Sequence, residues 1–283
     1  MKYIFFGTPW FSKIVLEGLV RAGMPSMALI CNPDRPVGRK KIITGPPTKQ
    51  LVTDEKLPIK IFQPEKLDAD FIAQLRALEP DFFVVFAYNK ILRKDVLDIP
   101  RLGTIGFHPS FLPRYRGPSP FQTALLNGEL ETGVTLYLLD EGVDSGPIIA
   151  TTEPVAITNA DTFNSLARKL AEAGGALLVK TLPAFNEGQI TPVPQDNAAA
   201  TLTKKFTAED GFVKAADLAA AQTGDIQKST YLDRKIRALN PEPGVWTMSD
   251  GKRIKLLKAE IENGALRLTE TQREGERPKS VGV

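Results

Sequence analysis

The chain has 283 residues, of which 42% are hydrophobic and 24% are charged, an ordinary balance for a globular protein. Its net charge of +3 excludes neither nucleic acid nor any other class of partner, so a basic surface would have to be local. A single cysteine, Cys31, excludes an intrachain disulfide, and with one histidine it leaves no cluster for zinc. No run approaches about 18 apolar residues, and the apolar run after Met1 is too short for a signal peptide, so we expect a cytoplasmic protein.

The N-terminal segment has the pattern of a strand, a helix and a second strand. Tyr3 to Phe6 is a continuous β-prone apolar run, which is typical of a strand buried on both faces. Apolar residues then keep helical spacing up to Gly23, after Thr8, which can cap a helix, and Pro9, which suits the first helical position. Met27 to Cys31 is the second strand. Together these elements predict a right-handed βαβ unit.

The segment Pro33 to Thr48 is rich in proline and glycine, and we expect a loop without regular structure. It carries one acidic residue against four basic residues, which are Arg35, Arg39, Lys40 and Lys41. Two interpretations remain open. Most charged runs are solvated loops, whereas clustered cations between rigid flanks favour a phosphate-binding surface.

Extended and helical patterns alternate through the middle of the chain. Strands are predicted at Ile59–Phe62, Phe82–Phe86, Thr104–Phe107, Gly133–Leu139 and Ile148–Val155, and helices at Pro47–Glu55, Ala69–Leu78, Lys94–Leu97, Pro120–Leu126 and Asp161–Leu182. Such alternation predicts an α/β fold with a doubly wound, mostly parallel sheet.

The character of the chain changes near Asn186. Residues 189–205 are polar and lack a clear period, and we interpret them as a linker between a catalytic domain (residues 1–188) and a smaller C-terminal domain (residues 206–283). In that tail, helices are predicted around Leu218 and at Ile226–Leu239, before strands at Val245–Met248, Arg253–Leu257 and Ala265–Thr269. Asp250-Gly251 indicates a hairpin turn between the first two strands, so the tail is predicted to be a small barrel or part of one.

His108 is the only histidine, and it follows the predicted strand Thr104–Phe107. Open α/β sheets bind ligands at the carboxyl ends of their strands, so His108 is a candidate acid/base residue. The segment Leu139 to Pro147 carries three carboxylates and two glycines, and a carboxylate beside an imidazole would stabilise the imidazolium. The alternatives, a hydrogen-bonded structural histidine and a polar hairpin, stay open. Motifs for dinucleotide, nucleoside triphosphate or esterase chemistry are missing.

Several motifs resemble those of one enzyme family. Ser110 to Gly117 reads Ser-Phe-Leu-Pro-Arg-Tyr-Arg-Gly and is similar to the SLLPRxRG signature of folate-dependent formyltransferases. The order of His108, this signature and the Leu139–Pro147 segment is the layout of that family, and Glu131–Thr135 and Phe6–Pro9 also match. The loop Pro33–Arg39 resembles the basic loop with which the branch acting on methionyl-tRNA contacts initiator tRNA. The similarity extends into the tail, where that branch has an OB-like domain.

The resemblance implies transfer of a formyl group from 10-formyltetrahydrofolate to the amino group of methionyl-initiator tRNA, without a metal. The catalytic trio of the family, Asn, His and Asp, maps to Gly106, His108 and Asp144. The implied folate-binding residues are Ser110, Phe111, Leu112, Pro113, Tyr88, Asn89, Leu139 and Asp140. The implied tRNA- and aminoacyl-binding residues are Gly7, Thr8, Arg35, Arg39, Lys40 and Lys41.

Gly106 departs from the family pattern because it has no side chain to stabilise an oxyanion. Losing one such donor can cost on the order of 3 kcal/mol. A backbone N–H, a water molecule or Asn89 could replace it, and we favour the first two.

From Phe206 onward, 13 Lys/Arg residues face 12 Asp/Glu residues, so only the cluster Lys252, Arg253, Lys255 and Lys258 supports nucleic-acid binding by the tail. Three alternatives remain: a sugar-nucleotide N-formyltransferase, a weakened folate- or RNA-binding homologue, and a formyl-folate hydrolase. We expect a monomeric enzyme of the tRNA-directed branch.

Overall fold

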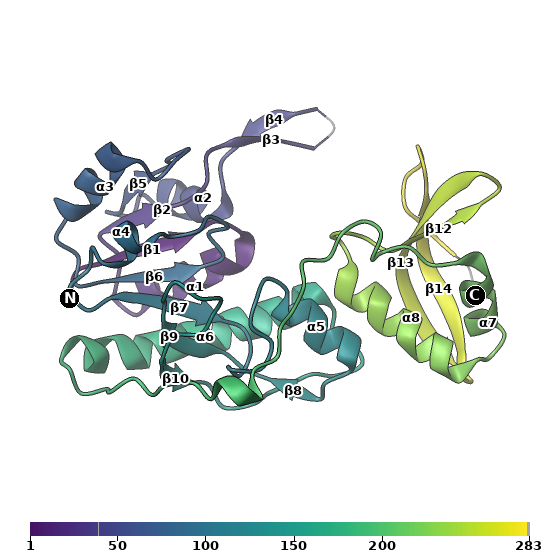
Figure 1. Ribbon diagram of the computed structural model, residues 1–283. Helices are drawn as coiled ribbons and strands as arrows, with labels where there is room; N and C mark the ends of the chain where they lie inside the picture. The colour runs from purple at the N-terminus through teal and green to yellow at the C-terminus, as the bar shows by residue number, and fades with distance from the viewer. Residues whose placement is uncertain (39, 282–283) are drawn as a thin grey trace. The chain divides into compact units, whose positions relative to one another are not determined.

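The computed structural model describes residues 1–38 and 40–281, which fall into two compact units (Figure 1). Unit 1 comprises Met1–Arg116, Gly133–Val155 and Ala167–Leu202, and unit 2 comprises the intervening segments and the chain from Thr203 onward. The chain therefore enters unit 2 more than once, whereas the sequence suggested a single linker after residue 188. The predicted domain boundaries stay a prediction. No helix of the described residues is long and apolar enough to cross a membrane.

Unit 1 is built on a seven-stranded sheet with the order β10-β9-β7-β6-β1-β2-β5. Its strands are β1 (Tyr3–Gly7), β2 (Ala28–Ile30), β5 (Lys60–Phe62), β6 (Phe82–Phe86), β7 (Thr104–His108), β9 (Thr135–Leu138) and β10 (Ile148–Thr151). The first five are parallel, and β9 and β10 are antiparallel to their neighbours. The central strands β1, β6 and β7 are buried on both faces, as their continuous apolar runs predict. The mostly parallel, doubly wound sheet is confirmed.

The helices of unit 1 are α1 (Trp10–Arg21), α2 (Pro47–Asp54), α3 (Ala69–Arg76), α4 (Lys94–Leu97) and α6 (Phe163–Asn186), of which the first turn of α6 falls in unit 2. The prediction for the start of α1 was wrong, because Pro9 is the N-cap and Thr8 makes no cap bond. Instead the Thr8 hydroxyl accepts a hydrogen bond from the backbone N–H of Asn32, 3.2 Å away. The helix α6 continues past its predicted end at Leu182, through Pro183, and buries Phe185 in its last turn.

The basic segment is a β-hairpin, so the prediction of an irregular loop was wrong. Strands β3 (Arg35–Val37) and β4 (Ile42–Thr44) pair in antiparallel register, and the hairpin extends out from the body of unit 1 (Figure 1). Proline is tolerated in an isolated two-stranded ribbon because each strand keeps a solvent-facing edge. Val37, Ile42 and Ile43 are each more than half exposed, so this hairpin contributes little to the core.

Two consecutive glycines set how closely α6 approaches its neighbours. A Cβ on Gly174 would lie 2.2 Å from Cζ of Phe107 on β7, so this position admits no side chain. A Cβ on Gly175 would lie 3.7 Å from Cα of Val15 on α1, which is an ordinary contact. Glycine inside a helix costs about 1 kcal/mol relative to alanine, and at Gly174 the close packing of helix on sheet offsets that cost.

These two glycines are expected to respond oppositely to the same substitution. Gly174→Ala should lower the free energy of unfolding by about 1–3 kcal/mol, because the new methyl group overpacks against Phe107. Gly175→Ala should leave stability unchanged or raise it by up to about 1 kcal/mol through helix propensity. Urea denaturation of both variants measures the difference, and equal effects would contradict the packing described for α6.

Unit 2 combines three helices with a four-stranded antiparallel sheet. Its helices are α5 (Pro120–Asn127), α7 (Ala215–Gln222) and α8 (Ile226–Leu239), and its sheet has the order β12-β13-β14-β15. The sheet strands are β12 (Trp246–Ser249), β13 (Lys252–Glu262), β14 (Ala265–Arg273) and β15 (Lys279–Ser280). Of two further two-residue strands, β8 (Glu131–Thr132) belongs to unit 2, whereas β11 (Val155–Ala156) has one residue in each unit. The helix α8 contacts β13 and β14 and buries Leu232, Ile236 and Leu239.

The turn at Asp250-Gly251 is confirmed, since it joins β12 to β13 with positive φ at both residues, as a type I′ turn requires. A second such turn, Asn263-Gly264, joins β13 to β14, and it escaped the sequence reading. Both long strands extend beyond their predicted ends. Strands β12 and β15 lie at opposite edges of the described sheet, and the OB-like assignment stays a prediction.

Candidate active site

The strand order reverses at the centre of the unit 1 sheet, which places the predicted active-site residues at one edge. The chain runs from β1 to β2 on one side and continues with β6 and β7 on the other. Ligands of such sheets bind outside the carboxyl ends of the strands at this switch point. His108 is the last residue of β7, and Gly7 is the last residue of β1. The prediction of a strand that ends at His108 is confirmed.

His108 is buried, and each of its ring nitrogens faces an oxygen acceptor. Nε2 lies 2.8 Å from the backbone oxygen of Tyr115, and Nδ1 lies 3.5 Å from Oδ2 of Asp144. Burial lowers the pKa of His108, and the Asp144 carboxylate opposes part of that shift. The shorter contact assigns the single proton of the neutral ring to Nε2, which donates to Tyr115. Nδ1 then presents a lone pair beside Asp144, so the arrangement can accept a proton at Nδ1.

The titration of His108 tests this arrangement directly, because a chain with one histidine gives one imidazole signal. In protein labelled with ¹³C and ¹⁵N histidine, NMR should give a midpoint below the usual value of about 6.5. Asp144→Asn should move the midpoint lower still, because the carboxylate is the group that favours the imidazolium. A midpoint above the usual value in the wild type would contradict the burial of a neutral ring.

Asp144 lies in the turn between β9 and β10, where the side chains of Tyr137 and Gln195 hold it. Its backbone adopts the left-handed region with φ of 49°, an uncommon conformation for an aspartate. The Tyr137 hydroxyl donates to Oδ1 over 2.5 Å, which leaves Oδ2 toward His108. The Gln195 amide donates to the backbone oxygens of Asp144 and Gly146 over 2.9 and 2.6 Å.

Gln195 comes from the segment interpreted as a linker, and no motif or spacing singled it out in the sequence. Its side-chain oxygen accepts from the guanidinium of Arg116 at 3.0 and 2.7 Å, and Arg116 also donates to Asn197 over 2.8 Å. Arg116 belongs to the signature segment, so Gln195 joins that segment to the Asp144 turn. A short helical turn, η1 (Asn197–Ala199), follows. The segment of residues 189–202 thus helps to hold the Asp144 turn and the signature segment in place.

The signature segment is folded against β9 by one threonine. Thr135 donates to the backbone oxygen of Ser110 over 2.7 Å and accepts from the backbone N–H of Leu112 over 3.0 Å. Thr135 pairs with His108 across the two strands, so these bonds hold Ser110–Pro113 next to the histidine. The Ser110 hydroxyl donates to the backbone oxygen of Arg114, and Phe111 covers Gly133, whose Cβ would lie 2.3 Å from its ring.

Gly106 faces the side chains of Tyr137, on β9, and of Leu139, the residue that follows β9. A Cβ built on Gly106 would lie 2.4 Å from Cε1 of Tyr137, 2.6 Å from its Cζ and 2.4 Å from Cδ1 of Leu139. Tyr137 is the cross-strand partner of Gly106, and its ring stands edge-on to His108 with the centroids 6.4 Å apart. Leu139 was among the predicted site residues, whereas Tyr137 was not. A tyrosine within a predicted strand has no feature that marks it as functional.

The other residues implied in folate binding occupy different environments. Tyr88 is buried in the same apolar cluster against which Leu139 packs, next to the end of β6. Its hydroxyl has no hydrogen-bond partner among the described residues, and burial raises its pKa. Asn89 is exposed and has φ of 63°, a conformation that asparagine tolerates better than most residues. Asp140 accepts from the backbone of Gly142 and from Ser145, so it stabilises the turn that carries Asp144.

The residues implied in aminoacyl and tRNA binding divide between the sheet edge and the hairpin. Gly7 ends β1 and Thr8 follows it, and a Cβ on Gly7 would lie 2.6 Å from Phe5, so the chain is tightly packed there. Arg35 forms an exposed ion pair of 2.9 Å with Glu65. Lys40 and Lys41 are exposed at the hairpin tip. Arg39 lies outside the described residues.

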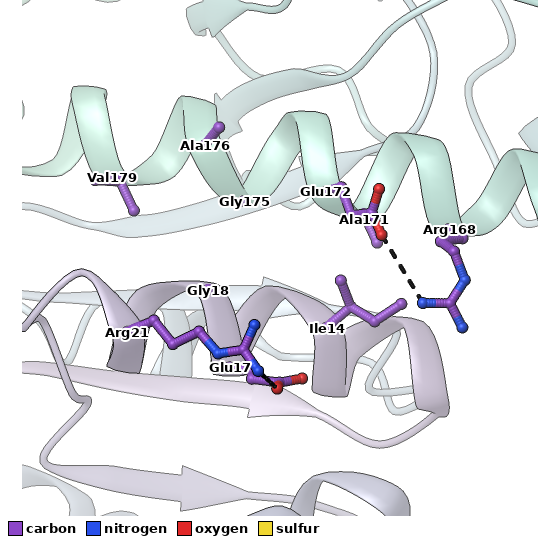
Figure 2. A pocket seen from close by; sticks show the side chains of 10 residues that line it. All are labelled: Ile14, Glu17, Gly18, Arg21, Arg168, Ala171, Glu172, Gly175, Ala176 and Val179. Atoms are coloured by element: carbon purple, nitrogen blue, oxygen red, sulfur yellow. Dashed lines mark hydrogen bonds and ion pairs between the residues drawn. The ribbon is translucent and has the colours of Figure 1, made fainter.

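A hollow of about 650 Å³ lies elsewhere in unit 1, between α1 and α6, and involves none of the predicted residues (Figure 2). Its charged residues pair along their own helices, Arg21 with Glu17 and Arg168 with Glu172, so no cation is directed at a ligand. Cys31 is buried, and burial raises the pKa of its thiol to about 11, as expected for a structural residue. Among residues 1–38 and 40–281, no group of histidine, cysteine and carboxylate side chains could hold a metal ion.

Comparison with known proteins identifies the relatives of this chain. The formyl transferase family matches residues 1–182, and the C-terminal domain of formyl transferases matches residues 226–276. The methionyl-tRNA formyltransferase of Halorhodospira halophila is 40% identical over 258 residues, which cover 91% of this chain and 79% of the relative.

Two solved structures share the fold. The match to the methionyl-tRNA formyltransferase of Clostridium thermocellum (15% identity, TM-score 0.62) covers 96% of this chain and 99% of that structure. The N-formyltransferase of Helicobacter canadensis, solved with folinic acid and dTDP-3-aminofucose (19% identity, TM-score 0.64), is covered to 88% by 93% of this chain. From the family match and the identity to its relatives, the chain belongs to the formyl transferase family.

Proposed function

We propose that this protein transfers the formyl group of 10-formyltetrahydrofolate to the amino group of methionyl-initiator tRNA. The observation that carries the proposal is the pair formed by buried His108 and partly exposed Asp144 at the carboxyl edge of the sheet, with Nδ1 and Oδ2 3.5 Å apart. Identity of 40% to a methionyl-tRNA formyltransferase over nearly the whole chain supports the choice of substrate.

The pair suits the proton movement that formyl transfer requires. In the reaction a bond forms between the amine nitrogen and the formyl carbon, the bond from that carbon to N10 of the folate breaks, and one proton leaves the amine. His108 accepts that proton at Nδ1 while its Nε2–H stays bonded to Tyr115. Asp144 stabilises the imidazolium so formed, and His108 then returns the proton to the leaving nitrogen.

The residues at the sheet edge fit a folate co-substrate. Leu139 packs against the cluster that contains Tyr88, while Thr135 holds Ser110 and Leu112 on the His108 side of β9. Apolar surface close to a few polar groups is what an aromatic ring system bearing amides needs. The Helicobacter relative bound to folinic acid supports this assignment. The chemistry needs no metal.

The β3–β4 hairpin is the proposed contact for tRNA in unit 1. Lys40 and Lys41 at its tip are exposed, and exposed Val37, Ile42 and Ile43 flank them. Lysines can contact phosphates, and apolar side chains can pack on sugars and bases. The combination favours a nucleic-acid contact over the alternative of a solvated loop. The tail cluster is weaker than the sequence suggests, because Lys258 pairs with Glu270 and Arg253 lies over the Trp246 ring at 4.1 Å. Such an enzyme would act in the cytoplasm, as a monomer.

An acceptor panel tests the proposal. The purified protein is incubated with 10-formyltetrahydrofolate and methionyl-initiator tRNA, an amino-sugar nucleotide, or no acceptor. We expect formylmethionyl-tRNA alone. Formylation of the sugar only would identify the sugar-nucleotide alternative, and formate release without acceptor would identify a hydrolase. Folate binding without any product would identify a binding homologue.

A further inference from the structure

Gly106 and Tyr137 are sterically coupled, and we call this pair the steric unit. The two residues pair directly across β7 and β9, and the Tyr137 ring occupies the volume that any side chain on Gly106 would need. The carbon that bears the hydroxyl, Cζ, lies 2.6 Å from the Cβ position of Gly106. A glycine at this point of a buried strand costs stability, and the close approach of Tyr137 explains why the cost is tolerated.

We propose that Tyr137 is a positioning residue of the formyl-transfer site, which uses the space left by Gly106 to hold Asp144 against His108. The catalytic role of Tyr137 rests on the proposed function. Its positioning of Asp144 does not depend on which substrate the enzyme uses. Oδ1 of Asp144 is taken by the Tyr137 hydroxyl at 2.5 Å, and Oδ2 is 3.5 Å from Nδ1 of His108. Tyr137 thereby fixes which carboxylate oxygen meets the imidazole.

The hydroxyl can perform this role because it remains protonated. Burial raises the pKa of Tyr137 well above its usual value, and the nearby charges of Asp144 and Asp140 raise it further. A neutral phenol bonded to a carboxylate stabilises the charged form of that carboxylate. The ionisable groups that face the His108 ring are the Asp144 carboxylate, near Nδ1, and the Tyr137 phenol, whose ring stands edge-on to it. Nε2 of His108 is bonded to the backbone oxygen of Tyr115.

Removing the hydroxyl should weaken the support that Asp144 gives to the imidazolium of His108. In Tyr137→Phe the ring still fills the space at Gly106, but Oδ1 loses its donor. Oδ2 is then no longer held toward Nδ1, and the imidazolium loses part of its counter-charge. The midpoint of the His108 titration should therefore fall, by about 0.5–1 unit.

The NMR titration of the single histidine measures this shift in the full chain, whatever the enzyme's substrate. Tyr3→Phe is the matched control, since the Tyr3 hydroxyl is also on a buried ring and donates over 2.5 Å to the Met24 backbone. Tyr3→Phe should cost stability and leave the His108 midpoint unchanged. An unchanged or raised midpoint in Tyr137→Phe, or an equal shift in both variants, would overturn the inference.

A double-mutant cycle on turnover tests the steric unit. Gly106→Ala should displace the Tyr137 ring, and each of Gly106→Ala and Tyr137→Phe should lower kcat about tenfold or more. Because both act through the same hydroxyl, the double variant should lose little more than the worse single variant. Multiplicative losses would refute the coupling. A wild type that fails to formylate methionyl-tRNA would refute the proposed function, and the titration would still decide the role of Tyr137.

Discussion

His108→Ala is expected to lower kcat for formyl transfer by about 10²–10⁴, the usual contribution of a general acid/base residue. The chain has no second histidine, and Nδ1 of His108 combines a lone pair with a carboxylate that stabilises its protonated form. Single-turnover formylation of methionyl-initiator tRNA measures the effect. KM for the tRNA should change far less than kcat, because the imidazole is not needed for binding.

The loss should not come from unfolding. His108 sits at the end of a strand, and the bond lost with its ring is the one to the Tyr115 carbonyl. Removing the ring should cost about 2–4 kcal/mol, less than the stability of a typical domain. Thermal unfolding of the variant checks this expectation. A folded His108→Ala protein with near wild-type turnover would remove His108 from the mechanism.

Asp144→Asn is expected to lower kcat by a comparable factor of about 10²–10⁴. The amide N–H would donate to Nδ1 of His108 and occupy the lone pair that takes the proton, and the imidazolium would lose its counter-charge. The Tyr137 hydroxyl can still donate to the amide oxygen, so the turn should keep its shape. Turnover against pH, with folding followed by circular dichroism, measures the loss.

The matched control for Asp144→Asn is Glu141→Gln, which removes an exposed carboxylate from the same turn. Glu141→Gln should leave kcat within a factor of a few, since surface charges contribute little. Equal losses in the two variants would mean that the turn contributes only its net negative charge, and the specific pairing of Asp144 with His108 would then be wrong.

The sheet could be predicted because its strands are buried on both faces. Runs such as Tyr3–Phe6 and Phe82–Phe86 are continuous and apolar, and each is followed by a helical pattern. The β3–β4 hairpin could not be predicted in this way, because Pro36 and Gly38 carry the composition of a loop while the pairing depends on backbone geometry. The turn at Asp250-Gly251 was predictable, since its residue types meet a specific φ requirement.

The two titratable residues of the site were predicted from the sequence, whereas the residues that hold them in place were not. His108 and Asp144 stand out as titratable groups in recognisable segments, and their pairing at 3.5 Å agrees with the sequence hypothesis. Tyr137 and Gln195 carry no local signal, because their importance comes from contacts made after distant segments fold together. The question raised by Gly106 concerned a missing side chain, and the structure places the Tyr137 ring in that volume.

Single-turnover formylation of methionyl-initiator tRNA, with wild-type enzyme in excess and 10-formyltetrahydrofolate supplied, decides whether formyl transfer depends on the His108–Asp144 pair. The formyl group should appear on the methionine amino group, far faster than without enzyme, and His108→Ala should abolish the acceleration. No formylmethionyl-tRNA from folded wild-type protein that binds folate, or equal rates with and without His108, would contradict a formyl transfer that depends on the His108–Asp144 pair.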